Sequence, residues 1–294
     1  MKKFIVCLIT LILIVPFASI FYACDKDEEQ KYEYVLMENI EYGSHSRQRL
    51  DICIPDSDTV GVMVFIHGGG WIGGDKSGYK KDLIEWAENY GYVTAAINYR
   101  YASESIHIDD IVSDIDMAMS KIKSVTTENG LDIRKALFTG GSAGGHLSMY
   151  YAYAKRDTAP IAPACVVDYC GPTDLTDGNY FIDDGNLDAT LLMASLISGT
   201  NLTIDNIEEN IEQLLHTSPI TFVDENTVPT VVCHGDKDDL VPYSNALRLI
   251  KEFDKYNVRY DIVTYINSGH GLESESGELR ATILMKEYAE TYLR

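Results

Sequence analysis

The chain has 294 residues, a length that fits one large α/β domain or two small ones. Hydrophobic residues make up 46% and charged residues 23%, so the composition supports a packed globular core. A formal net charge of -21 argues against partners that are themselves anionic, because such a surface repels nucleic acid and acidic membranes.

The first 23 residues predict the signal peptide of an exported bacterial lipoprotein. Lys2 and Lys3 precede an apolar run over 4–15, which falls short of the about 20 residues that a spanning helix needs. Ala23-Cys24 then resembles a lipobox, in which the cysteine is lipidated, although Phe21 departs from the usual leucine. The alternative is an ordinary signal peptide with a chance cysteine at this place.

Residues 24–34 are short and charged and predict a flexible tether. Together with Cys24, they predict a protein held at the outer membrane or cell surface through its N-terminal lipid alone.

Residues 35–294 predict a single α/β domain. Residues 32–55 suggest two leading strands, paired as an antiparallel hairpin at the edge of a sheet. From about residue 60, short apolar runs typical of buried strands alternate with segments of helical spacing. This alternation predicts a mainly parallel sheet with helices on both faces. The expected strands are 62–66, 92–98, 136–139, 164–168, 230–233 and 260–265, and the expected helices are 79–90, 108–125, one that starts after Ser142, 244–253 and 278–293.

The stretch 176–226 interrupts this rhythm and predicts a short cap segment. It is polar, with helix-like apolar runs at 189–197 and 204–215. Its most apolar part, 191–197, is expected to pack on the core. We interpret this insertion between two expected strands as a cap segment and not as a separate domain.

The four cysteines after Cys24 predict buried free thiols, because three of them lie in apolar, strand-like runs. A disulfide stays open as an alternative, since four cysteines allow three pairings. No spacing of cysteine or histidine predicts a metal site. The four are Cys53, Cys165, Cys170 and Cys233.

Ser142 is the candidate nucleophile. It lies in Gly140-Gly141-Ser142-Ala143-Gly144, which matches G-x-S-x-G and stands between an expected strand and an expected helix. The tight turn exposes the hydroxyl and directs the amide of Ala143 toward a bound carbonyl. A plain glycine-rich turn is the alternative for the motif without its context.

A second motif, His67-Gly68-Gly69-Gly70-Trp71, predicts an oxyanion loop. Glycines allow backbone amides to approach a substrate oxygen closely, so Gly69 and Gly70 are the expected donors together with Ala143. A phosphate loop is disfavoured, because no Lys-Ser/Thr follows. His67 is expected to hold the loop. Trp71 is the candidate substrate-binding aromatic, with packing as its alternative.

The remaining triad members follow two late strands. His270, between glycines in Ser268-Gly269-His270-Gly271, is the candidate base. Three aspartates after the strand at 230–233 are candidates for the acid that orients this histidine. They are Asp236, Asp238 and Asp239. The other histidines are interpreted as surface or structural residues.

These motifs resemble the α/β-hydrolase superfamily, in its esterase and lipase branch, and more closely the BD-FAE-like proteins, a group of bifunctional feruloyl and acetyl-xylan esterase-like proteins. The resemblance spans about residues 35–294. It rests on the two motifs above with 170–175, Ser218-Pro219 and His234-Gly235-Asp236. Gly141 departs from the aspartate usual in hormone-sensitive-lipase-like enzymes, which favours the BD-FAE-like group.

The resemblance implies the α/β-hydrolase fold and a cofactor-free serine esterase. It places the acid three residues after Gly235 and three before Val241, at Asp238, with Asp239 as second choice. The implied substrate is an acetyl or feruloyl ester on plant carbohydrate. The alternatives are a general short-chain carboxylesterase or lipase, a prolyl-oligopeptidase-like peptidase and, as the least favoured, a non-catalytic binding protein.

Overall fold

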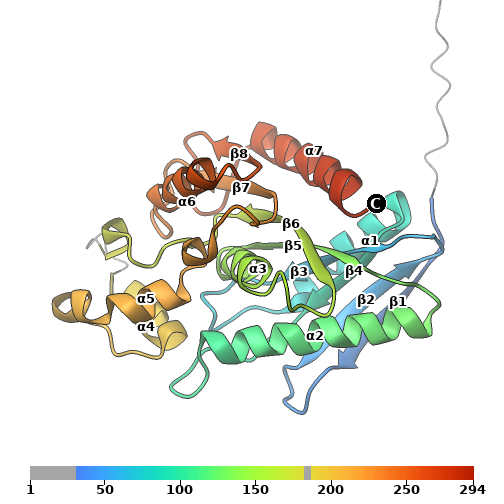
Figure 1. Ribbon diagram of the computed structural model, residues 1–294, viewed down its shortest axis with the longest axis horizontal. Helices are drawn as coiled ribbons and strands as arrows, with labels where there is room; N and C mark the ends of the chain where they lie inside the picture. Colours follow the sequence, from blue (N-terminus) through green and yellow to red (C-terminus); the bar gives the residue numbers. More distant parts are fainter. Residues whose placement is uncertain (1–30, 182–186) are drawn as a thin grey trace, which may run out of the picture. The chain divides into compact units, whose positions relative to one another are not determined.

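The computed structural model describes residues 31–181 and 187–294, so the predicted signal peptide and Cys24 lie outside the described residues. Within these ranges eight strands form one sheet, in the order β1-β2-β4-β3-β5-β6-β7-β8 (Figure 1). Strand β2 is antiparallel to both of its neighbours, and the other pairs are parallel. The predicted edge hairpin and mainly parallel sheet are therefore confirmed. The strands are β1 (Tyr34–Glu41), β2 (Arg49–Pro55), β3 (Gly61–Ile66), β4 (Val93–Ile97), β5 (Lys135–Gly141), β6 (Ala162–Tyr169), β7 (Thr230–Gly235) and β8 (Tyr260–Tyr265).

Helices cover both faces of the sheet. Alternate residues of each buried strand point to opposite faces. Val62 and Val64 of β3 belong to the core under α2, α3 and α6, whereas Met63 and Phe65 belong to the core under α1 and α7. Within the described ranges, the helices that cover the sheet are α1 (Lys80–Tyr90), α2 (Ile108–Glu128), α3 (Ala143–Ala154), α6 (Ser244–Tyr256) and α7 (Glu275–Tyr292).

Most helix ends follow the signals in the sequence. Helix α1 ends at Gly91, whose φ of 70° gives the left-handed conformation that suits glycine at a helix end. Helix α7 begins earlier than expected, because Ser274 caps it by accepting a hydrogen bond from the amide of Gly277. Helix α2 continues beyond Val125 to Glu128.

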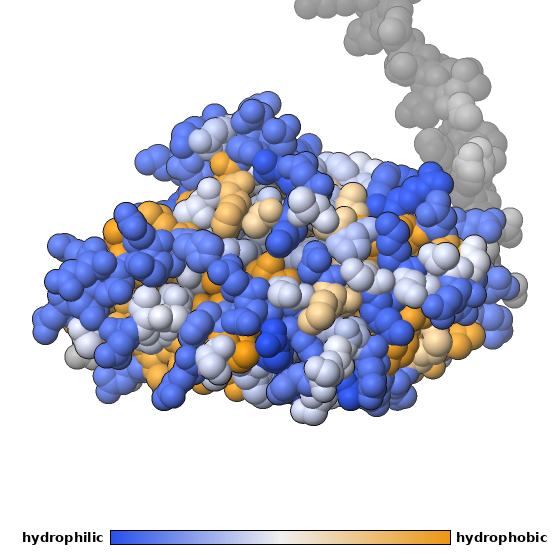
Figure 2. Space-filling view, turned by 60° about the horizontal axis from the view of Figure 1, so that its bottom comes forward, coloured by the Kyte–Doolittle hydropathy of each residue, from blue (hydrophilic) through white to orange (hydrophobic). Residues whose placement is uncertain are grey.

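The cap segment forms α4 (Leu187–Ser198) and α5 (Ile211–Thr217), and neither matches its prediction fully. The prediction of a single helix over 204–215 was wrong, because two 3₁₀ turns, Ile204–Asn206 and Glu208–Asn210, precede α5. Nor does all of 191–197 pack on the core. Ala194 and Ile197 are buried, but Leu192 is 54% exposed. Elsewhere on the surface too, apolar residues lie among hydrophilic ones, as one face of the molecule shows in Figure 2.

All four cysteines of the described chain are buried free thiols, as the sequence predicts. Among the described residues, none of the helices has the length and apolar character needed to cross a membrane.

Candidate active site

Ser142 occupies a strained turn between β5 and α3. Its φ of 55° and ψ of -125° lie in a region that side chains other than glycine rarely adopt. The turn is tight because Gly140 and Gly144 both lie against the carbonyl oxygen of Ile66, which a Cβ at either position would overlap. The Ser142 amide donates to the carbonyl of Tyr169 in β6 at 2.8 Å. The side chain is thereby held half-exposed at the carboxyl edge of the sheet.

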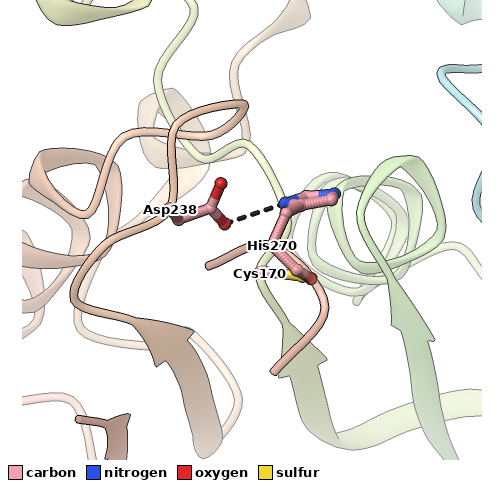
Figure 3. Close-up of side chains that lie close together, drawn as sticks. All are labelled: Cys170, Asp238 and His270. Carbon is pink, nitrogen blue, oxygen red and sulfur yellow. Dashed lines mark hydrogen bonds and ion pairs between the residues drawn. The ribbon is translucent and has the colours of Figure 1, made fainter. Parts of the chain in front are cut away.

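His270 and Asp238 come from the loops after β8 and β7 and lie together. His270 Nδ1 is 2.8 Å from Asp238 Oδ2 (Figure 3). The Asp238 carboxylate has no exposed surface, whereas the His270 side chain is 24% exposed. The structure therefore pairs the predicted base with one of the three candidate acids.

Local hydrogen bonds fix the Asp238 carboxylate and keep it ionised. Its Oδ1 accepts from the amides of Leu240 and Val241, at 3.0 and 2.8 Å. Burial alone raises its pKa, but hydrogen bonds from His234 and His270 and the amide of Val241 outweigh burial and hold the pKa below the usual range. A buried anion beside Nδ1 is what an imidazole needs to accept a proton at its other nitrogen.

The two other aspartates are placed differently. Asp239 is exposed. Asp236 accepts a hydrogen bond from the amide of Asn267 at 2.6 Å, which joins the loops after β7 and β8. Of the three candidates, Asp238 is the one in contact with His270.

The remaining ring nitrogen of His270 is available for chemistry. Figure 3 shows it on the side of the ring that points away from Asp238. Among residues 31–181 and 187–294, this Nε2 has no hydrogen-bond partner. The His270 carbonyl accepts a weak hydrogen bond from Cys170 Sγ at 3.5 Å, which ties the base to the loop after β6.

The predicted oxyanion loop, residues 67–71, lies directly against Ser142. A Cβ on Gly68 would stand 2.6 Å from the carbonyl oxygen of Gly141 and 3.4 Å from Ser142 Cβ. Gly69 and Gly70 have φ values of 106° and 59°. Within the described chain, the amides of Gly69, Gly70 and Ala143 donate to no protein acceptor, so they are free to bind a substrate oxygen.

His67 braces this loop, as expected. Its Nε2 lies 2.9 Å from an Arg47 guanidinium nitrogen, which only donates, so Nδ1 carries the hydrogen and donates to the Gly68 carbonyl at 2.8 Å. The ring stacks on Tyr99 with 4.3 Å between centroids. Burial lowers the pKa of His67 to about 4, so the neutral form persists at physiological pH.

Trp71 does not offer the aromatic binding surface predicted as its functional role. The residue is 3% exposed, and its indole Nε1 donates to His146 Nδ1 at 3.1 Å. The alternative, a packing tryptophan, describes it better. Its side chain packs in the core against the His146 ring, with 5.0 Å between ring centroids.

Sequence reasoning missed three residues around the site. The sequence predicts a surface or structural role for His146, and its place four residues after Ser142 on a helix is the signal that indicates a position beside the site. Cys170 has a φ of 49° and lies beside His270. The Met193 thioether of α4 lies against Gly70.

One group of side chains in the described chain has the composition of a metal site. It consists of Cys170, Asp238 and His270, with potential ligand atoms within 4.8 Å of one another. Burial raises the pKa of the Cys170 thiol and disfavours the thiolate that a metal binds. The contact between Asp238 and His270 is also accounted for by their hydrogen bond.

The chain is similar to a known family and to several known proteins. The BD-FAE family model matches residues 50–253. The probable carboxylic ester hydrolase LipM of Mycobacterium tuberculosis is 28% identical over 272 residues, covering 86% of this chain and 61% of LipM. The chain thus spans about three fifths of that relative's length.

Two solved structures show the same fold. A truncated carbohydrate esterase from gut microbiota superposes with a TM-score of 0.71 at 20% identity, covering 89% of this chain and 98% of that one. Esterase B of Lactobacillus rhamnosis gives 0.70 at 18% identity, with 87% and 85% covered. The chain belongs to the BD-FAE family and has the α/β-hydrolase fold.

Proposed function

We propose that this protein is a serine carboxylic ester hydrolase with Ser142 as nucleophile, His270 as base and Asp238 as the orienting acid. The hydrogen bond between His270 Nδ1 and Asp238 Oδ2, made at the same sheet edge as the Ser142 turn, carries the proposal. The free amides of Gly69, Gly70 and Ala143 support it. The names of relatives and structural neighbours, which are mainly esterases, point to the same reaction.

In the first half-reaction, His270 Nε2 takes the hydroxyl proton of Ser142 as Oγ bonds to the ester carbonyl carbon. The carbonyl oxygen becomes an anion that accepts hydrogen bonds from the free amides of the oxyanion loop and Ala143. Collapse of this intermediate breaks the bond to the alcohol, which leaves with the proton from His270. Buried Asp238 stabilises the imidazolium meanwhile.

In the second half-reaction, water replaces the alcohol. His270 takes a proton from the water as its oxygen attacks the acyl-enzyme, and the same amides bind the new oxyanion. The bond to Ser142 Oγ then breaks, and the proton returns to that oxygen. The products are a carboxylic acid and the free enzyme, and each step uses residues of this chain.

We propose that the substrate is an acetyl or feruloyl-type ester of plant carbohydrate. The fold neighbours include the gut-microbiota carbohydrate esterase and a bifunctional GH43-CE protein of Bacteroides eggerthii, the latter with a TM-score of 0.69 at 21% identity. A neutral glycan ester also suits a chain with a net charge of -21, which disfavours anionic ligands.

Two other reactions are outcomes of the test. LipM and Esterase LipQ carry names that favour a general short-chain carboxylesterase. The acylamino-acid-releasing enzyme of Mus musculus is 25% identical, although the chain covers only 31% of its length, and it favours a peptidase.

The deciding experiment is a substrate panel with Ser142→Ala as the control. It compares acetylated and feruloylated xylan oligosaccharides, simple p-nitrophenyl esters and an N-acetylaminoacyl peptide. We expect release of acetate or ferulate with the highest kcat/KM. A kcat/KM on the p-nitrophenyl esters equal to that on the xylan esters favours the general carboxylesterase. Cleavage of the peptide alone contradicts the proposal.

A further inference from the structure

His146 stands at the junction of three parts of the molecule. It lies on α3 one turn after Ser142, and its amide donates to the Ser142 carbonyl at 3.0 Å. The side chain has no exposed surface. Its Nδ1 accepts from Trp71 Nε1 at 3.1 Å, and its Nε2 lies 2.8 Å from the carbonyl oxygen of Thr217. The imidazole thus connects the nucleophile helix, the oxyanion loop and the end of α5 in the cap segment.

The two contacts fix one form of the ring. Indole Nε1 only donates, so His146 Nδ1 has to be the unprotonated acceptor, and Nε2 carries the hydrogen that goes to Thr217. Both bonds therefore require a neutral imidazole. Burial lowers the pKa of His146 to about 4, which keeps the ring neutral across the physiological range.

We propose that His146 is a positioning residue that holds the oxyanion loop in register with Ser142 and with the cap segment. The inference rests on the proposed function, because it concerns the amides that bind the oxyanion. His146 does not touch the reacting atoms. It acts through Trp71, which directly follows the donors Gly69 and Gly70.

Within the described chain, this end of the loop is also held by the Ile72 amide, which donates to the Gly69 carbonyl at 3.1 Å, but the indole nitrogen of Trp71 is held by His146. Trp71 adopts a φ of 63°, and its carbonyl accepts one hydrogen bond, from Ala102 at 2.9 Å. Its indole meets the His146 ring edge-on, with 5.0 Å between centroids. On this proposal, loss of the His146 contact leaves the indole held by core packing alone, and a shift of the ring displaces the adjoining amides. A misplacement of about 1 Å in such donors costs about a hundredfold in rate.

The cap side of the junction is itself anchored. Ser218, next to Thr217, accepts from the amide of Leu175 at 2.8 Å and donates to the carbonyl of Leu214 at 2.6 Å. The His146 contact therefore ends on a fixed point rather than on a loose turn.

The test separates the two arms of the contact. His146→Asn retains a short oxygen acceptor for Trp71, whereas His146→Gln reaches toward Thr217 with its amide. Trp71→Phe removes the indole donor together with part of the buried ring volume. The control is Tyr153→Phe, which removes a fully buried hydrogen bond to Thr230 further along the same helix. Each variant is assayed on p-nitrophenyl acetate for kcat and KM, and for the inhibition constant of phenylboronic acid, which forms a tetrahedral adduct.

We expect His146→Gln and Trp71→Phe to lower kcat about tenfold to a hundredfold, with KM within about threefold, since the lost interaction acts on the transition state. Boronate affinity should fall in parallel, His146→Asn should recover most of kcat, and the double variant Trp71→Phe/His146→Gln should lose no more than either single variant.

Three results would overturn the inference. They are kcat within twofold of the parent for both Trp71→Phe and a folded His146→Gln, an equal loss in Tyr153→Phe, or a change confined to KM. If His146→Gln does not fold, Trp71→Phe carries the test. Failure of the proposed function looks different, because Ser142→Ala would then be as active as the parent.

Discussion

The Met193 thioether lies against the backbone of Gly70, so closely that a Cβ on residue 70 would overlap Sδ. Helix α4 of the cap segment thus closes over one of the proposed oxyanion donors. Gly70 remains half-exposed, but the space above it is limited.

We predict from this contact that short acyl chains are preferred. In a fitted apolar trench, each added pair of methylenes favours binding by about 1.6 kcal/mol, so the efficiency of a lipase rises with chain length. Here kcat/KM should decline from acetyl through butyryl and octanoyl to palmitoyl esters. Met193→Ala should raise the octanoyl-to-acetyl ratio, with Leu192→Ala, an exposed neighbour, as its control. A steady climb to palmitoyl in the parent would indicate a general lipase.

Removal of the nucleophile or base should abolish hydrolysis without unfolding the protein. We expect Ser142→Ala and His270→Ala each to lower kcat by about 10⁴ or more, as losses within such a triad do. Esterase assays and circular dichroism check the two parts. Turnover within about tenfold of the parent would reject the assignment.

The acid should be identified by asparagine substitutions. Asp238→Asn removes the buried charge beside His270 Nδ1 and should cost about 10⁴ in kcat. Asp239→Asn changes an exposed side chain and serves as the matched control, with kcat expected within about twofold. A larger loss at Asp239 would move the acid by one position.

Stability should depend on pH between about 4 and 6.5 because of two buried neutral histidines. The pKa values of His67 and His146 are both lowered to about 4 by burial, so below 6.5 the unfolded chain binds protons that the folded chain excludes. Stability from each is complete above pH 6.5 and falls by about 1.4 kcal/mol per pH unit toward pH 4.

Urea titrations of the parent and of His67→Gln at several pH values measure this slope. The change of unfolding free energy with pH should be smaller in the variant, by the about 1.4 kcal/mol per pH unit that one histidine contributes. Parallel curves for the two proteins would show that His67 is not buried neutral.

We predict that Cys24 carries a lipid, because the first 23 residues have the pattern of a lipoprotein signal peptide. Mass analysis of the mature N-terminus after expression in a Gram-negative host should find a diacylglyceryl group on Cys24 and no residues before it. The control is the Cys24→Ser variant, which should no longer be found in the membrane fraction. An unmodified Cys24, or cleavage elsewhere, would exclude the lipoprotein.

The strands and the turn at Ser142 could be predicted from sequence because each is encoded locally. Continuous apolar runs specify strands buried on both faces, and Gly140 and Gly144 leave little choice for the turn at Ser142. The orientation of Trp71 was not predictable, because its partner His146 is 75 positions away. Local spacing also left Asp238 and Asp239 open. The two residues differ in the tertiary structure, because the His270 loop lies beside Asp238, which is buried, whereas Asp239 is exposed.

The placement of β8 at the sheet edge has a consequence for how the protein loses activity. Within the described ranges, strand β8 pairs with β7 alone, and the loop that follows it carries His270. An edge strand opens at lower free energy than the centre of a sheet. Heat or denaturant should therefore detach the base while β3, β5 and Ser142 are still in place. Hydrolysis then reports on the loop after β8, and enzymatic inactivation should precede global unfolding.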